Sequence, residues 1–152
     1  MKLDRKFLLC SLAYAVVGMC VGIYMAASKD HGQFVAHAHI LLVGFVVSFI
    51  YGLIHKLWVS AEKVGAAKVQ FYLHQLSALL MGIGLLLLYG GLFQEIVDPI
   101  LATSALGVLV SAILMVYLVI RFPKTEGASS QAVPTQSRIP ADMADPVGSL
   151  GG

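Results

Sequence analysis

Four long apolar runs dominate the chain and are separated by short polar segments. They extend over residues 7–27, 34–58, 69–91 and 96–120. Each reaches the roughly 20 residues that an α-helix needs to cross about 30 Å of hydrocarbon. None alternates strictly between apolar and polar residues, which excludes the strands of a membrane barrel. Because a helix satisfies its own backbone hydrogen bonds in lipid, the pattern predicts an all-α integral membrane bundle of four transmembrane helices.

Composition supports this fold class over a soluble one. Hydrophobic residues make up 59% of the chain and charged residues 12%, whereas soluble domains carry about 25% charged residues. A net charge of +2 provides no basic face for nucleic acid. The first apolar run is longer than the roughly 7–15 residues of a signal-peptide core, so we expect it to be a retained helix.

Lys and Arg predict the orientation of the bundle. They lie before the first run, between the second and third runs, and after the fourth run: Lys2, Arg5, Lys6, Lys56, Lys63, Lys68, Arg121 and Lys124. The other two connections contain only Lys29. The positive-inside rule therefore places both termini in the cytoplasm, as expected for a bacterial-type inner membrane. Residues 1–123 form the predicted membrane domain, and residues 124–152, rich in small and polar residues, form a predicted disordered cytoplasmic tail.

Small residues at helical spacing predict close contacts between helices. Gly18 and Gly22 form a G-x-x-x-G in the first run, and Gly107 and Ser111 repeat this spacing in the fourth. Ordinary membrane glycines would give the same pattern.

Five histidines carry the candidate chemistry. His37, His39 and His74 fall within apolar runs, where polar groups are costly and mark function by default. His31 lies in the first connection and His55 lies beside Lys56. Cys10 and Cys20 have no Cys-x-x-Cys spacing and are interpreted as buried thiols, so a copper carrier is disfavoured.

His37 and His39 are two residues apart, so on a helix their side chains diverge by roughly 200°. They cannot hold one metal ion together, and each needs a partner from elsewhere. This geometry suits a helix placed between two haems or two subunits, since neutral imidazole is a common axial ligand of haem iron. A pH-sensing or structural pair is the alternative.

His74 is a weaker candidate ligand. His39 and His74 each lie about 8 Å inside opposite surfaces, which separates them by roughly 15 Å along the membrane normal. His74 could join His55 in a second metal site, but a core histidine bonded to a hydroxyl or a carbonyl is the favoured interpretation.

A family resemblance supports the haem interpretation. Val35-Ala36-His37-Ala38-His39 with the following Gly44-Phe45 resembles the tenth helix of the haem–copper oxidase catalytic subunit, the cbb-type in particular. The similarity covers roughly residues 28–91, under half of the chain. It implies that His37 holds a high-spin haem and His39 a low-spin haem, with haem b as the expected cofactor.

The chain departs from this family at its copper site. The pair of adjacent histidines, the His-x-x-x-Tyr element and the deep carboxylates of the proton channels are missing, and Ile40 stands where a tyrosine could follow the second histidine. One chain is therefore not expected to reduce oxygen. Because the oxidase subunit has twelve helices in three arcs of four, we expect three copies of this chain to form a ring with a haem between His37 of one copy and His39 of the next.

Three functions follow from these patterns. The first is a membrane haem protein that transfers electrons or binds and senses a diatomic gas, without a complete oxygen-reduction site. The second is a non-catalytic accessory or assembly subunit of a respiratory complex. The third is a copper or proton carrier.

Overall fold

The computed structural model describes residues 1–60 and 65–124, and it confirms the four predicted membrane helices. Three spans are single helices: α1 (Leu3–Ser28), α4 (Gly65–Tyr89) and α5 (Gln94–Arg121). The second span consists of three consecutive segments, α2 (Phe34–His39), η1 (Ile40–Val47) and α3 (Ser48–Leu57). All four are long and apolar enough to cross a bilayer, so the chain is an integral membrane protein. The predicted tail lies outside the described residues, apart from Lys124.

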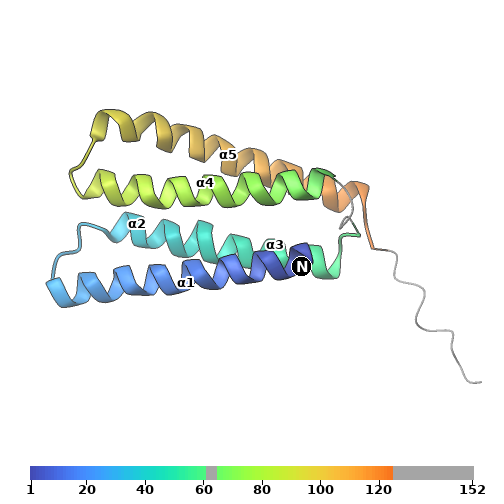
Figure 1. Cartoon of the computed structure of the whole chain (residues 1–152), viewed down its shortest axis with the longest axis horizontal. Helices are drawn as coiled ribbons and strands as arrows, with labels where there is room; N and C mark the ends of the chain where they lie inside the picture. The colour runs from blue at the N-terminus through green and yellow to red at the C-terminus, as the bar shows by residue number, and fades with distance from the viewer. Residues whose placement is uncertain (61–64, 125–152) are drawn as a thin grey trace, which may run out of the picture.

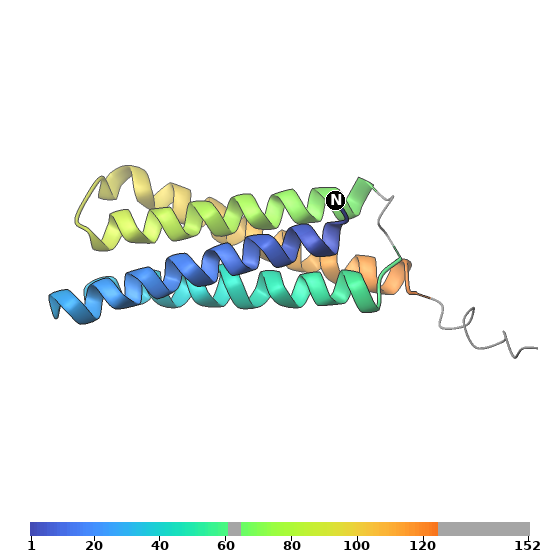
Figure 2. The same ribbon diagram turned by 60° about the horizontal axis from the view of Figure 1, so that its bottom comes forward.

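Two antiparallel hairpins pack side by side to form the bundle (Figure 1). One hairpin joins α1 to the second span, and the other joins α4 to α5. The N-terminus and the end of α5 lie at the same end of the bundle in both views (Figures 1 and 2). We call this the basic end and the opposite end the loop end, because the described Lys and Arg residues of the three predicted cytoplasmic segments lie at the basic end: Lys2, Arg5, Lys6, Lys56, Lys68, Arg121 and Lys124.

Helix ends follow local chain chemistry. α1 begins at Leu3, four residues before the predicted apolar run, so the polar residues before Phe7 are also part of the helix. It ends at Ser28, and the following residue, Lys29, has a left-handed φ of 57°. The loop before α5 turns at Gly91, with φ of 73°, a conformation that glycine adopts without a steric penalty. The predicted boundaries of the other helices agree with the structure to within four residues.

The middle of the second span is a π-helix. Residues Ile40–Val47 form η1, which begins directly after His39 and ends where α3 begins at Ser48. π-helices are rare, occur mostly within longer α-helices, and are frequent at functional sites. Gly44 of η1 lies against the ring of Tyr14, and an added Cβ there would come 2.6 Å from Tyr14 Cγ. Helix α1 therefore packs closely along the wider π segment.

The apolar core lies near the basic end. It gathers large side chains from all four spans: Leu3, Phe7, Tyr51, Val59, Ala67, Phe71, Met115 and Leu118. Closer to the loop end, small residues bring the helices together, as predicted. Gly18 meets Leu41 of η1, and Gly107 of α5 meets Ser77 of α4. Cys10 is half-buried, but Cys20 is exposed on the bundle surface, so the expectation of a buried thiol was wrong there.

A short backbone pairing closes the basic end. Val59 forms an isolated antiparallel bridge with Pro123. The Ser60 amide donates to the Phe122 carbonyl at 2.9 Å, and the Lys124 amide donates to the Trp58 carbonyl at 2.8 Å. The end of α3 is thereby tied to the end of α5, although these two segments are far apart in the sequence.

Candidate functional site

His37 lies at the contact between α2 and α1. Its Nδ1 is 2.9 Å from the Gly18 carbonyl oxygen of α1. An added Cβ at Gly22 would come within 2.9 Å of His37 Cε1, so the imidazole fills the space that this glycine leaves open. The two glycines of the G-x-x-x-G in α1 thus contact different side chains of the second span: Gly18 contacts Leu41, and Gly22 contacts the His37 ring.

His39 has different surroundings. Its Nδ1 is 2.9 Å from the carbonyl oxygen of Val35, one turn earlier in its own helix. Within the described residues, no other helix contributes a hydrogen bond to this ring. Both His37 and His39 are half-buried. The expected divergence of the two side chains therefore holds: His37 faces α1, and His39 bonds only to its own helix.

The two hydrogen bonds determine which ring nitrogen is protonated. A backbone carbonyl can only accept, so Nδ1 of each ring must carry the hydrogen. In a neutral imidazole the lone pair is then on Nε2. A metal-binding histidine commonly donates its second ring N–H to a carbonyl in this way, which fixes the tautomer and orients the ring. Both rings are thus prepared to offer Nε2 as a ligand atom.

His74 is placed for a structural role. It is fully buried in α4, with Nδ1 at 3.2 Å from Ser111 Oγ and Nε2 at 3.1 Å from Ser48 Oγ. Gln75 Nε2 donates to the same Ser48 hydroxyl at 3.1 Å. Ser111 Oγ donates its own hydrogen to the Val108 carbonyl at 3.0 Å, so it accepts from His74 Nδ1–H, and Nε2 then accepts from the Ser48 hydroxyl. His74 links three membrane spans, and neither nitrogen is left for a metal.

His55 belongs to a separate polar group near the basic end. Its ring stacks on Phe7, with centroids 5.4 Å apart. Its Nε2 is 3.4 Å from Gln70 Oε1, and Gln70 Nε2 is buried without a hydrogen-bond partner. The structure does not bring His55 and His74 together through a shared hydrogen bond, and each has its own partners. The inner metal site considered from the sequence therefore has no geometric support.

Sequence reasoning overlooked the serines and glutamines that complete these networks. Ser48, Ser111 and Gln70 are each fully buried within membrane spans, where an isolated polar residue is expensive. The signal available in the sequence was their position inside apolar runs, since a hydroxyl or an amide in hydrocarbon needs a partner. Ser111 had been noted only as a small packing residue.

The donor set fits a haem only in part. In the described portion of the chain, no group of three or more His, Cys, Asp or Glu side chains is arranged to hold a metal ion. The two available Nε2 atoms belong to rings that diverge around one helix, so they cannot both bind the same iron. The His37 and His39 pair of one chain therefore supplies a single axial nitrogen to any one haem, and bis-histidine ligation by these residues would need the second nitrogen from another copy.

No protein-family model, curated protein or solved structure matches this chain.

Proposed function

We propose that this protein binds haem b in the membrane through His37 and His39 and serves in electron transfer or in binding and sensing a diatomic gas. The observation that supports this most strongly is the pair of Nδ1–H···O=C hydrogen bonds, at 2.9 Å each, which leaves Nε2 of both rings as the lone-pair nitrogen. The π-helix that begins at the next residue adds support, since such segments are frequent at functional sites.

The divergence of the two rings favours a homo-oligomer as the haem-binding form. A haem between two copies would take His37 from one copy and His39 from the next, and a closed ring of three copies would repeat this arrangement. Bis-histidine ligation leaves no open coordination position and favours electron transfer, whereas a single histidine leaves a position for nitric oxide, oxygen or carbon monoxide. Our proposal includes no oxygen reduction, because the copper ligands of the similar oxidases are missing from the sequence.

We further propose that the basic end faces the cytoplasm of a bacterial-type cell, so that both termini are cytoplasmic. The distribution of Lys and Arg supports this, because the described segments at the loop end contain only Lys29. The haem ligands would then lie towards the outer surface.

A second candidate function is that of an accessory or assembly subunit with no cofactor. The observation in its favour is the His37 ring, which already joins α1 to α2 through the Gly18 carbonyl and packs against Gly22. In this alternative, the imidazole is a structural link between two helices.

The visible spectrum of the detergent-purified protein, expressed with excess haem, distinguishes the two candidates. Haem binding predicts a Soret band and, after reduction with dithionite, split α and β bands. His37→Ala and His39→Ala should each lower the haem content, while His31→Ala, in the exposed first connection, should leave it unchanged. A colourless protein that remains helical would reject the haem proposal and favour the accessory subunit.

Oligomeric state is the second measurement. Light scattering of the red fraction should give three chains per particle, and its absorbance should give one haem per chain. A monomer that retains one low-spin haem would contradict the interface arrangement, because one chain cannot offer both nitrogens to one iron.

A further inference from the structure

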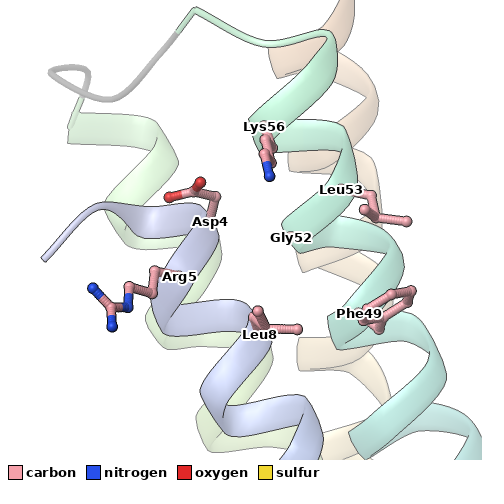
Figure 3. A pocket seen from close by; sticks show the side chains of 7 residues that line it. All are labelled: Asp4, Arg5, Leu8, Phe49, Gly52, Leu53 and Lys56. Carbon is pink, nitrogen blue, oxygen red and sulfur yellow. The ribbon is translucent and has the colours of Figure 1, made fainter.

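A groove between α1 and α3 opens at the basic end of the bundle (Figure 3). Its volume is about 350 Å³, which lies within the range of small-ligand sites. The lining residues come from the first turns of α1 and from most of the length of α3: Asp4, Arg5, Leu8, Phe49, Gly52, Leu53 and Lys56. It is separate from His37 and His39, which lie towards the loop end.

The groove changes from charged to apolar along its length. Asp4, Arg5 and Lys56 line the end nearest the N-terminus, and Figure 3 shows Lys56 extending towards the gap between the two helices. Leu8 and Phe49 line the other end. Seven residues separate Phe49 from Lys56, which corresponds to about 10 Å along the helix axis. This polarity matches a phospholipid with its head group at the interface and its acyl chain along the helices.

The bundle is closely packed beneath the groove. An added Cβ at Gly52 would come 3.1 Å from Phe7 Cβ and 3.3 Å from the Asp4 carbonyl oxygen. The backbones of α1 and α3 therefore approach each other closely there, so that the groove has a firm floor and opens towards the surrounding lipid.

Charge and hydrogen bonding specify the head group. Arg5 and Lys56 are exposed cations, and one Asp4 carboxylate makes the formal charge of the lining +1. This charge complements a lipid with one phosphodiester and no cationic group. Asp4 Oδ1 is a buried acceptor with no hydrogen-bond partner among the described residues. Because a buried acceptor without a partner is costly, a head group that donates a hydroxyl would be stabilised beside it.

We propose that this groove binds an anionic phospholipid whose head group carries hydroxyls, with phosphatidylglycerol as the simplest example. The phosphate lies near Lys56, a head-group hydroxyl donates to Asp4, and an acyl chain lies against Leu8 and Phe49, while Arg5 adds positive charge at the rim. Basic pockets between membrane helices on the cytoplasmic side commonly recognise anionic lipids in this way. The proposal does not depend on haem binding.

Native mass spectrometry of the detergent-solubilised full chain tests this proposal. The protein is titrated with phosphatidylglycerol, phosphatidylethanolamine and phosphatidylcholine of equal chain length. We expect phosphatidylglycerol to bind most tightly, and Lys56→Gln to weaken its binding about fivefold, as loss of one cation near a lipid head group predicts. Lys68→Gln is the matched control, since Lys68 is exposed at the same end but does not line this groove.

Two further variants separate a specific site from general surface charge. Asp4→Asn should reduce the preference for phosphatidylglycerol although it raises the formal charge of the lining from +1 to +2, because an amide oxygen is a weaker acceptor for the head-group hydroxyl than a carboxylate. Phe49→Ala should weaken all three lipids by a similar factor. Equal binding of the three lipids by the unmodified protein, an effect of Lys68→Gln as large as that of Lys56→Gln, or an unchanged preference in Asp4→Asn would each overturn the proposal.

Discussion

Ser48→Ala should destabilise the bundle through loss of two buried hydrogen bonds. The Ser48 hydroxyl is fully buried and lies 3.1 Å from both His74 Nε2 and Gln75 Nε2. Hydrogen bonds between membrane helices contribute about 0.6 kcal/mol on average and about 1.7 kcal/mol at most. The substitution should therefore lower the free energy of unfolding by about 1–3 kcal/mol. Only one oxygen is removed, so cavity formation adds little.

The assay is equilibrium unfolding in mixed micelles with increasing dodecyl sulfate, followed by far-ultraviolet circular dichroism. Ser28→Ala is the control, because Ser28 Oγ bonds only within its own helix and its own turn at the exposed end of α1. In a His74→Phe background, the cost of Ser48→Ala should fall to about half, since only the bond to Gln75 remains to be lost. An equal cost in both backgrounds, or a cost below about 0.3 kcal/mol, would refute the view that His74 is held by these hydroxyls.

Three other substitutions test the packing, each by the same unfolding assay. Gly22→Ala should cost about 1–3 kcal/mol because its Cβ would come 2.9 Å from His37 Cε1, and His37→Ala should relieve most of that loss. Gly107→Ala should cost a similar amount, since the new methyl would meet Ser77 Oγ, and a neutral result would show that α4 and α5 can separate freely. Gln70→Leu should change stability by less than about 1 kcal/mol, because it removes a buried amide nitrogen that has no partner together with a long hydrogen bond, and a large loss would reveal a missing partner such as a bound water.

The membrane helices were predictable because length and hydropathy alone decide whether a segment can span a bilayer. The spacing of Gly18 and Gly22 likewise predicted a close contact, and the two-residue spacing of His37 and His39 predicted their divergence. The sequence did not predict which residues of other helices contact each face of a given helix. That Ser48 and Ser111 meet His74 depends on which helices are adjacent and at what height, and periodicity within one helix does not contain this information.

The hydrogen bonds of the histidine Nδ1 atoms also could not be predicted from the sequence. Those of His37 and His39 end on backbone carbonyls, which every residue possesses, so no residue type marks them. The resemblance to haem–copper oxidases pointed to the same two residues, and it stays a prediction until the spectrum is measured.

The π-helix separates the second span into two halves whose angular positions are set independently. In a continuous α-helix, the angle about the helix axis between His39 and Ser48 would be fixed, so a rotation that changes the direction of one side chain would also displace the other. In η1, the wider turns of Ile40–Val47 absorb such a shift. Deletion of one residue there would shorten the span by about 1.5 Å and turn the histidine pair by roughly 100° relative to the serine. The π segment thus allows the direction of the histidine pair to change during evolution while the buried network around His74 keeps its alignment.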